Sequence, residues 1–570
     1  MRHPFDEERL VGFVYRVEPT AVEVTLPHAG RRPKTFHGLR LARGEVGEFV
    51  VVDVGGQGLF GRVSVVWLAA RDRDAAEFVS TRESEIHPVG RVQLFSTIRM
   101  DGTHARGLDR YPRIGDPVYS AAPDVLEAVL GQAPVDSKED DRQVLMGTLA
   151  SATAVVVKIS PERLIGRHLA VVGATGSGKS WTVAHIIEEV HRLGGKAIVI
   201  DATGEFRTLD AIATHIAIGG PATPTDGATA TSLPHTEMTE SDLHVFLRPS
   251  AGAQLPRLRA AVQSLRLAAV LEPDDPLVEG GCIRKAHLPR KPYLAAYKEH
   301  ITVVEAPTGA FDLNLLPVQI QHECVYDVDL NDHTKFGSRL MNDIAYCTSL
   351  IARTYDVLRS PETMAVLQPT DARASAFEAL ESFLVDSSSH VLRISLRELP
   401  FARSLREIVV NAIGRRLLEL AREGRFATKP LLVCIDEAHQ FFGRTVGDEF
   451  VSTRLEHFES IAKEGRKYGL TVCMATQRPG DIPGAVLSQA GMLLVHRLGD
   501  GRDRERIEQA SSELDRSAAE QLPSLLPGEA LFVGVDFPVP IAVRIKRPMR
   551  PPASEGPSYS SGWGTAPRET

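Results

Sequence analysis

The chain has 570 residues, 43% of them hydrophobic and 24% charged, which is enough for two to four domains of ordinary soluble composition. Its 65 basic and 73 acidic residues give a net charge of −8, which excludes a protein that coats nucleic acid by bulk attraction but permits a local basic channel. There is no apolar run of about 18 residues and no signal core, and the five cysteines are scattered, so we expect a cytoplasmic protein with reduced thiols and no membrane span.

The first predicted elements are short strands within residues 1–150. Glycine and proline separate five runs with strand character: Val11–Val17, Ala21–Leu26, Glu48–Val54, Gly58–Val66 and Val92–Ile98. Several short strands at close spacing favour a small β-barrel or sandwich. Because no catalytic cluster occurs among them, we interpret this region as an assembly or partner-docking module.

From residue 151 to 546 the pattern changes to apolar strands that alternate with helices. The predicted strands are Leu169–Val172, Ala197–Ile200, Val391–Leu396, Leu431–Ile435 and Leu470–Ala475. The predicted helices between them include Lys179–Leu193 and Leu405–Ala421. This alternation predicts an α/β domain whose parallel sheet is covered by helices on both faces.

A long insertion, in part helical, interrupts this domain between about residues 206 and 389. Apolar positions within 340–358 recur at helical spacing, and we interpret this stripe as core packing. Residues 283–298 mix lysines and arginines with tyrosines, so this stretch either grips nucleic-acid phosphates or forms a solvated basic face. Residues 547–570, rich in Pro, Ser and Gly, predict a flexible tail.

The clearest motif is a G-x-x-x-x-G-K-S phosphate loop, Gly173-Ala174-Thr175-Gly176-Ser177-Gly178-Lys179-Ser180. It follows an apolar strand and opens a helix, so backbone N–H groups and the positive end of the helix can surround phosphate oxygens. Lys179 can reach the β- and γ-phosphates, and Ser180 can ligate Mg²⁺. The motif predicts ATP and Mg²⁺ as cofactors, and we include the adjacent Trp181 among the nucleotide-binding residues.

Two later strands end in residues that suit the rest of such a site. The strand Leu431–Ile435 runs into Asp436, which would hold Mg²⁺, and Glu437, which can polarise the attacking water. The next strand ends close to Gln477, which either senses the γ-phosphate and orients the water or simply lies in a turn.

Two arginines complete the candidate site. Arg167 precedes the phosphate-loop strand, and Arg466 lies in the segment 463–470. An arginine that stabilises transition-state charge accelerates nucleotide hydrolysis by ~10³–10⁵-fold, and a ring-forming ATPase can supply it from a neighbouring subunit. A single arginine is more often a solvated surface residue, so both assignments depend on the surrounding pattern.

In this order the motifs resemble the HerA family of ATPases, part of the HerA/FtsK group of DNA-pumping motors. The resemblance covers residues from about 153 to 546 and rests on five segments: Arg167–Ser180, Asp201–Phe206, Ile435–His439, Glu464–Leu470 and Thr476–Pro479. The β-rich amino-terminal region is similar to the small barrel that precedes the motor in this family. One departure is that the family often has Pro-His where this chain has Ala202-Thr203.

The resemblance implies a P-loop RecA-like motor domain and a homohexameric ring, with ATP bound at the subunit interfaces and duplex DNA in the pore. It implies four catalytic residues: Glu437, Gln477, Arg466 (the candidate for action in trans) and Arg167. Asp201 and Glu205 match an acidic motif beside the nucleotide. The implied Mg²⁺ ligands are Ser180 and Asp436.

HerA-like proteins commonly work with a second protein, which is a NurA-like nuclease in DNA end processing and a nuclease or sirtuin-like effector in anti-phage defence. The sequence leaves two functions open. The first is an ATP-dependent DNA translocase or helicase that serves such a partner in DNA repair or antiviral defence. The alternative is a scaffold or regulatory ATPase ring that assembles and switches a defence effector with little DNA translocation.

Overall fold

The computed structural model describes residues 5–29, 34–36, 39–68, 88–99, 104–130, 142–272, 274–400, 404–447, 452–514, 516–534 and 539–554. The chain divides into two compact units: the first comprises Met1–Leu193 with Thr471–Pro551, and the second comprises Gly194–Leu470 with Pro552–Thr570. Within the described ranges, no helix is both long and apolar enough to cross a bilayer.

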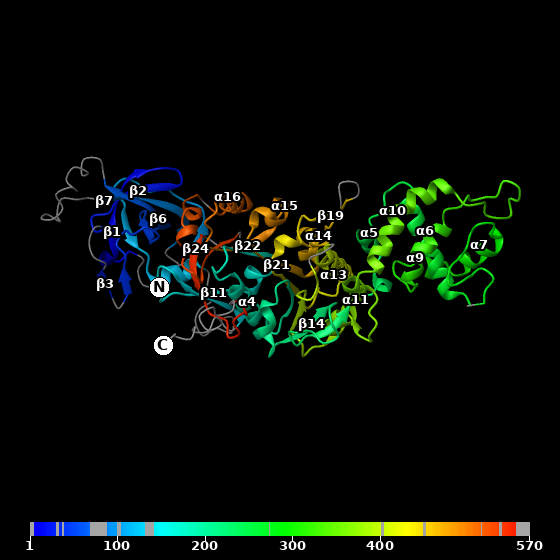
Figure 1. The fold of residues 1–570 in the computed structure, drawn as a ribbon. Coiled ribbons are helices and arrows are strands. Elements are labelled where there is room, and N and C mark those ends of the chain that lie inside the picture. The colour runs from blue at the N-terminus through cyan, green and yellow to red at the C-terminus, as the bar shows by residue number, and fades with distance from the viewer. Residues whose placement is uncertain are drawn as a thin grey trace, which may run out of the picture. The chain divides into compact units, whose positions relative to one another are not determined.

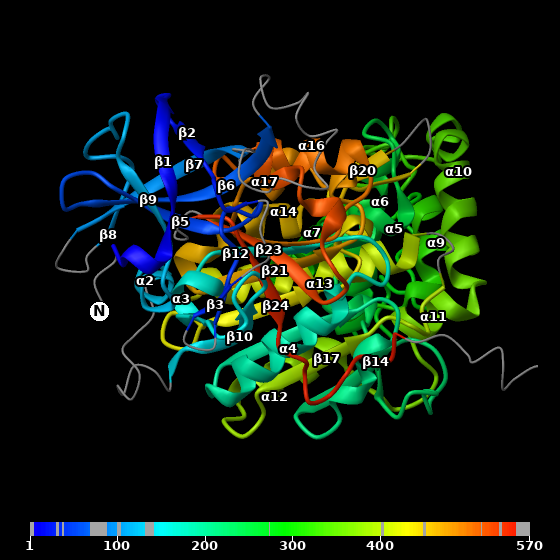
Figure 2. The ribbon, with the colours of Figure 1, turned by 90° about the vertical axis from the view of Figure 1, so that its left-hand side faces the viewer.

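The amino-terminal part of the first unit is a closed antiparallel β-barrel (Figures 1 and 2). Its strand order is β2-β1-β9-β5-β6-β7, with β8 added at the end, and the pairing of β2 with β7 closes it. The strands are β1 (Leu10–Val17), β2 (Ala21–Thr25), β5 (Phe49–Asp53), β6 (Gly58–Leu68), β7 (Pro88–Ile98), β8 (His104–Arg106) and β9 (Pro117–Ser120). Inward-facing valines such as Val14, Val24 and Val52 fill the barrel, as the alternation of strand side chains requires. The predicted barrel is confirmed.

The rest of the first unit holds a sheet in the order β11-β10-β24-β23-β22-β12-β21. The strands are β10 (Val144–Leu149), β11 (Val156–Ile159), β12 (His168–Val172), β21 (Leu470–Thr476), β22 (Ala490–His496), β23 (Glu529–Gly534) and β24 (Ile541–Ile545). The helices of this unit are α2 (Pro123–Val129), α3 (Pro161–Leu164), α4 (Lys179–Arg192), α15 (Gly484–Leu487), α16 (Gly501–Ala510) and α17 (Arg516–Ala519).

This sheet is mixed: the predicted strands β12 and β21 pair in parallel, and an antiparallel edge that the sequence analysis does not include is added to them. Strand β12 pairs in parallel with β21 and β22, but β22, β23, β24, β10 and β11 pair antiparallel. The antiparallel pairing of β10 with β11 has a physical reason, because only residues 150–155 join the two strands. A connection this short permits a hairpin but not the crossover of a dozen or more residues that parallel strands need.

The sheet of the second unit is parallel throughout, in the order β18-β13-β17-β14-β15-β16. The strands are β13 (Lys196–Asp201), β14 (Ala213–Ile218), β15 (Thr229–Ser232), β16 (Ala374–Ser375), β17 (Val391–Ser395) and β18 (Leu431–Ile435). Every residue of β13, β17 and β18 is buried, as expected for strands covered on both faces. Strands β14, β15 and β16 lie within the predicted insertion, so part of that segment extends the sheet.

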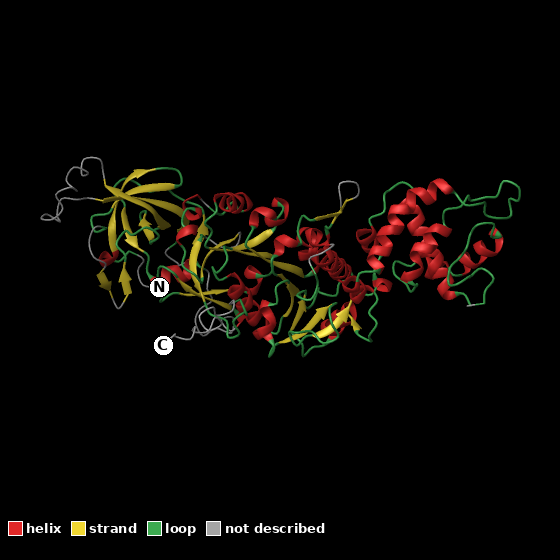
Figure 3. Ribbon diagram, in the orientation of Figure 1, coloured by secondary structure: helices red, strands yellow, loops and turns green. Residues whose placement is uncertain are grey.

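The remainder of the insertion is helical (Figure 3). The main helices of the second unit are α5 (Glu240–Leu247), α6 (Gln254–Val270), α7 (Arg290–Glu299), α9 (Leu316–His322), α10 (Met341–Leu358), α11 (Pro361–Leu367), α12 (Ala376–Val385), α13 (Leu405–Arg422) and α14 (His457–Glu464). The apolar stripe on α10 does pack inward, because Cys347 and Ile351 are buried.

The basic stretch 283–298 is neither wholly a grip for nucleic-acid phosphates nor wholly a solvated basic face. Lys285 is buried, and its Nζ lies 2.6 Å from the carboxylate of Glu323 and 4.6 Å from the ring centroid of Tyr293. Arg284 is exposed and pairs with Glu279 at 2.7 Å. Lys285 and Tyr293 therefore hold the helices of the insertion together, and only part of the stretch presents basic groups to solvent.

Candidate nucleotide-binding site

The phosphate loop connects β12 to α4 in the first unit, as predicted. Gly178 precedes the helix with a φ of 112°, a left-handed conformation that favours glycine, and no side chain caps the helix. Lys179 Nζ donates to the carbonyl of Ala174 at 3.1 Å, and Ser177 Oγ donates to the same carbonyl at 2.7 Å. The loop is thus curled over the positive end of α4, where an anion is stabilised.

Neighbouring segments of the first unit hold the backbone of the loop. The N–H of Ala174 donates to the carbonyl of Arg497 at 2.9 Å, just beyond β22. The N–H of Gly528, just before β23, donates to the carbonyl of Ser177 at 2.9 Å. The loop is therefore supported from both ends of the segment that connects these two strands.

Strand β21 brings Gln477 to the phosphate loop. Because β21 pairs in parallel with β12, the carboxyl ends of both strands lie at one edge of the sheet. Thr175 Oγ1 donates to Gln477 Oε1 at 2.5 Å. This contact favours the interpretation in which Gln477 faces the phosphates over a simple turn.

Arg167 and Trp181 lie at different distances from the loop. Arg167 packs against Gly491 before the first residue of β12, whereas the loop follows the last one. Five residues of extended strand span about 16 Å, so Arg167 lies at the opposite end of the strand from the phosphate loop and not near the phosphates of this site. Trp181 is half-buried in the first turn of α4, and the guanidinium carbon of Arg547 lies 6.0 Å from its ring centroid.

The acidic residues gather in the second unit, where β13 and β18 end side by side. Asp436 is buried, and Thr203 Oγ1 donates to its Oδ2 at 3.0 Å. Burial, followed by the charges of Asp201, Glu437 and Glu205, raises the pKa of Asp436 to about 8. Thr203 is one of the two positions where the sequence departs from the family, and its hydroxyl favours the ionised form of Asp436.

Glu437 has a strained backbone next to this group. Its φ of 48° lies in the left-handed region, which non-glycine residues seldom adopt and which recurs at functional sites. His439 Nδ1 lies 3.2 Å from Glu437 Oε2. The carboxylate therefore lies beside an imidazole and follows a left-handed backbone.

Asp201 does not offer its carboxylate to a ligand. The carboxylate is fully buried and accepts the backbone N–H groups of Gly204 at 2.7 Å and Phe206 at 3.1 Å. The buried Arg393 donates Nε to it at 2.7 Å. Asp201 therefore shapes the loop that carries Glu205, whose Oε2 is buried without a hydrogen-bond partner in the described part of the chain.

The oxygen atoms of these side chains are of the kind that binds a divalent cation. Carboxylate and hydroxyl oxygens are the ligands that Mg²⁺ prefers, and a cation would offset the charges of Glu437 and Glu205, which together with burial raise the pKa of Asp436. Glu205 Oε2 adds a buried acceptor that lacks a donor.

Arg466, in the turn Gly465–Tyr468, is exposed to solvent.

Sequence reasoning missed three residues around the site: Thr203, Arg393 and His496. Arg393 sits inside the predicted strand β17, where an arginine among apolar residues was an available signal. Thr203 stood out only as a departure from the family. His496 ends an apolar run, Ala490–His496, that was not recognised as a strand.

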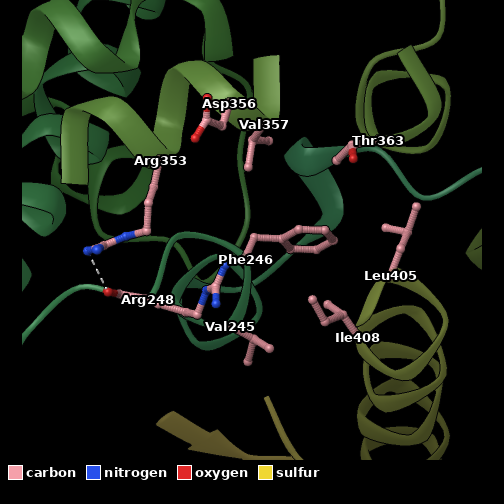
Figure 4. A pocket seen from close by; sticks show the side chains of 9 residues that line it. All are labelled: Val245, Phe246, Arg248, Arg353, Asp356, Val357, Thr363, Leu405 and Ile408. Carbon is pink, nitrogen blue, oxygen red and sulfur yellow. Dashed lines mark hydrogen bonds between the residues drawn. The ribbon is translucent and has the colours of Figure 1, made fainter. Parts of the chain in front are cut away.

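A separate pocket in the second unit contains none of the predicted site residues (Figure 4). It lies among α5, α10, α11 and α13 and includes Phe246, Arg248 and Arg353, of which Arg353 donates to the carbonyl of Arg248 at 2.9 Å. Its volume of about 100 Å³ is below the roughly 300–1,000 Å³ of small-molecule sites, so it is not a nucleotide pocket.

Comparison with known proteins places both parts of the chain in one family. Residues 144–273 match the family "Helicase HerA, central domain", and residues 415–556 match "Helicase HerA-like C-terminal". A probable helicase of Methanocaldococcus jannaschii is 23% identical over 472 residues, which cover 81% of this chain and 77% of the relative. The DNA double-strand break repair helicase HerA of Pyrococcus furiosus is 24% identical over 446 residues, which cover 76% and 73%.

Among solved structures, VirB4 of Thermoanaerobacter pseudethanolicus aligns with a TM-score of 0.44 at 14% identity, over 71% of this chain and 96% of that one. The strand–loop–helix with its G-K-S motif, set in an α/β motor fold behind a barrel, defines a P-loop ATPase. Both family matches and the curated relatives then identify the branch: the chain belongs to the HerA family.

Proposed function

We propose that this chain is an ATP-dependent DNA translocase that acts on duplex DNA as a homohexamer. The observation that carries the proposal is the contact between Thr175 and Gln477, which joins a γ-phosphate sensor to a complete phosphate loop. The relatives named as DNA double-strand break repair helicases support DNA as the substrate. ATP hydrolysis is expected to drive movement along the duplex, because the fold has the parts of a motor.

In this proposal each residue has a defined role. Lys179 and the loop amides would bind the β- and γ-phosphates, and Ser180 and Asp436 would hold Mg²⁺. When bound, Mg²⁺ neutralises phosphate charge. Glu437 accepts the proton of the attacking water, and Gln477 orients that water.

The remaining predicted residues act from further away. Glu205 adds negative charge beside Asp436, and Asp201 positions Glu205 through the loop amides. Trp181 lies beside the phosphates and contributes contact area to the nucleotide. Arg167 would act on the nucleotide of another subunit, because it lies far from the phosphate loop of its own.

Arg466 is the proposed trans-acting arginine of the ring. Its guanidinium is exposed, which leaves it available to a neighbouring subunit. The ring would pass the duplex to a partner, which we propose to be a NurA-like nuclease or a defence effector docked on the barrel. The assembly would work in the cytoplasm, in DNA repair or in antiviral defence.

The test is the steady-state ATPase rate with and without linear duplex DNA, with Glu437→Gln as the blank. We expect strong stimulation by the duplex that fades as salt rises, because phosphate contacts release counterions. A rate indifferent to DNA would contradict translocation and favour the scaffold ring that switches an effector. Loss of ATP binding in Lys179→Ala is the control that the measured rate belongs to this site.

A further inference from the structure

A buried histidine lies directly beneath the phosphate loop. His496 is the last residue of β22, and its side chain is fully buried. One ring nitrogen, Nδ1, lies 2.8 Å from the carbonyl of Glu529 at the start of β23. The other, Nε2, lies 2.9 Å from Thr182 Oγ1 in the first turn of α4. The imidazole therefore joins two strands to the helix that starts at the loop.

The two contacts fix the protonation of the ring. A carbonyl oxygen only accepts, so Nδ1 carries the proton, and Nε2 must accept the hydroxyl proton of Thr182. Burial, together with the nearby charge of Lys179, lowers the pKa of His496 to about 4 although the contact with the carbonyl of Glu529 raises it, so the imidazole is neutral at pH 7. A neutral ring adds no second positive charge beside Lys179.

The imidazole also fills the space under the glycines of the loop. A Cβ atom at Gly173 would lie 2.5 Å from the Cβ of His496, and one at Gly178 would lie 3.5 Å from its Cε1. The first distance is too short for two carbon atoms, so Gly173 is required by the β-carbon at position 496 whatever side chain it carries, whereas the second is an ordinary contact with the imidazole itself. The loop and the imidazole are thus packed as one layer.

We propose that His496, through Thr182, is a positioning residue that holds the phosphate loop in its nucleotide-binding shape. This inference rests on the proposed function, because it concerns the same nucleotide. The hydrogen bond to Thr182 fixes the first turn of α4, whose N–H groups face the phosphates. Loss of that bond should weaken ATP binding and leave the chemical step at saturating ATP largely intact.

The sharpest test changes Thr182, which keeps the histidine in place. Thr182→Val removes the hydroxyl at nearly constant shape, and Thr182→Ser retains it. We expect the KM for ATP and the Kd for ADP to rise about fivefold to tenfold in Thr182→Val, the size of one buried hydrogen bond, and to stay within about twofold in Thr182→Ser. The kcat should change by less than about threefold, because the hydroxyl does not touch the reacting atoms.

A second pair of variants approaches the bond from the histidine. His496→Asn keeps a donor near the Nδ1 position and loses the contact with Thr182, so it should match Thr182→Val. His496→Leu loses both bonds and should bind ATP more weakly still. The matched controls are His185→Asn, on the same helix but bonded to the carbonyl of Leu145, and Thr97→Val in the barrel.

The outcomes separate this inference from the proposed function. Equal nucleotide affinity in Thr182→Val and wild type, with both folded by thermal melting, would overturn the positioning role. Weakened affinity in Thr182→Ser or in the two controls would show general destabilisation and would also overturn it. If the wild type itself binds no ATP, the proposed function fails before the variants are compared.

Discussion

At the scale of single residues, Glu437 is distinguished by geometry as well as by its motif. Its carboxylate lies 3.2 Å from His439 Nδ1, and its backbone is in the left-handed region that recurs at functional sites. Glu437→Gln keeps the shape and loses the proton acceptor. We expect ATP binding within about threefold of wild type and a kcat lowered by ~10²–10⁴-fold, the range of general-base catalysis. Nucleotide titration and phosphate release measure the two; normal turnover would remove Glu437 from the catalytic role.

Arg393 has the opposite character, because it is structural and wholly buried. It donates to Asp201 at 2.7 Å and to Asp226 at 2.8 Å, and none of the three is exposed. Arg393→Met leaves two buried carboxylates without their cation, so the free energy of unfolding should fall by about 3–5 kcal/mol. Denaturant unfolding measures this. Arg284→Met, which breaks an exposed pair with Glu279, should cost less than about 1 kcal/mol.

His496 also makes stability depend on pH. Its folded pKa of about 4 lies below the unfolded value of about 6.5, so the unfolded chain binds the proton first. The stability it contributes is complete above pH 6.5 and is lost as the pH falls toward 4. Between pH 7 and pH 5 the loss is about 2 kcal/mol, at 1.36 kcal/mol per pKa unit. Melting curves of nucleotide-free protein should show a smaller loss over this interval in His496→Asn, and an equal loss would contradict the assignment.

At the scale of elements, the first residues of the predicted tail form hydrogen bonds with a helix. The N–H groups of Met549 and Arg550 donate to the carboxylate of Glu188 on α4 at 2.8 and 2.7 Å. The tail beyond residue 554 lies outside the described residues. The composition of 547–554 predicts flexibility, but a single carboxylate on the helix supplies acceptors that composition does not reveal.

Removal of that carboxylate tests the attachment. In Glu188→Ala the amides of Met549 and Arg550 lose their acceptor, so hydrogen exchange at these two amides should accelerate at least tenfold, while Ala553 keeps its bond to the carbonyl of Glu205. Exchange in α4 itself should change little, because its backbone bonds remain. Glu127→Ala on α2 is the matched control. Unchanged protection of the two amides in Glu188→Ala would show that other contacts hold this segment.

The elements also show how far the sequence predicts the fold. Strands such as Leu431–Ile435 were predicted correctly because an apolar run before an acidic residue is a local signal. The antiparallel edge was missed because β10 pairs with β24, almost 400 residues further along the chain, and periodicity carries no information on partners. For the same reason the motifs predicted Asp201 but not Arg393, which occupies its carboxylate.

At the scale of the whole molecule, the barrel is attached to the motor sheet by a buried arginine. Arg62 of β6 donates to the carbonyl of Pro540, which precedes β24, at 3.3 Å. It also lies 3.5 Å from Ser517 Oγ of α17, in the segment whose two ends support the phosphate loop. The proposed partner, if docked on the barrel, would therefore act on a body that includes the loop.

The proposed ring can be tested by mixing variant subunits, because a complete site needs Lys179 from one subunit and Arg466 from the next. Lys179→Ala and Arg466→Ala should each lose ATPase activity alone. Mixed one to one, random pairing gives about a quarter of interfaces an intact lysine facing an intact arginine, so activity should return in part. A mixture of Lys179→Ala with Glu437→Gln should stay inactive, because both changes fall in the same half of the site. No return in the first mixture, once native mass spectrometry shows mixed rings, would contradict action in trans; a return in the second would place Glu437 across the interface.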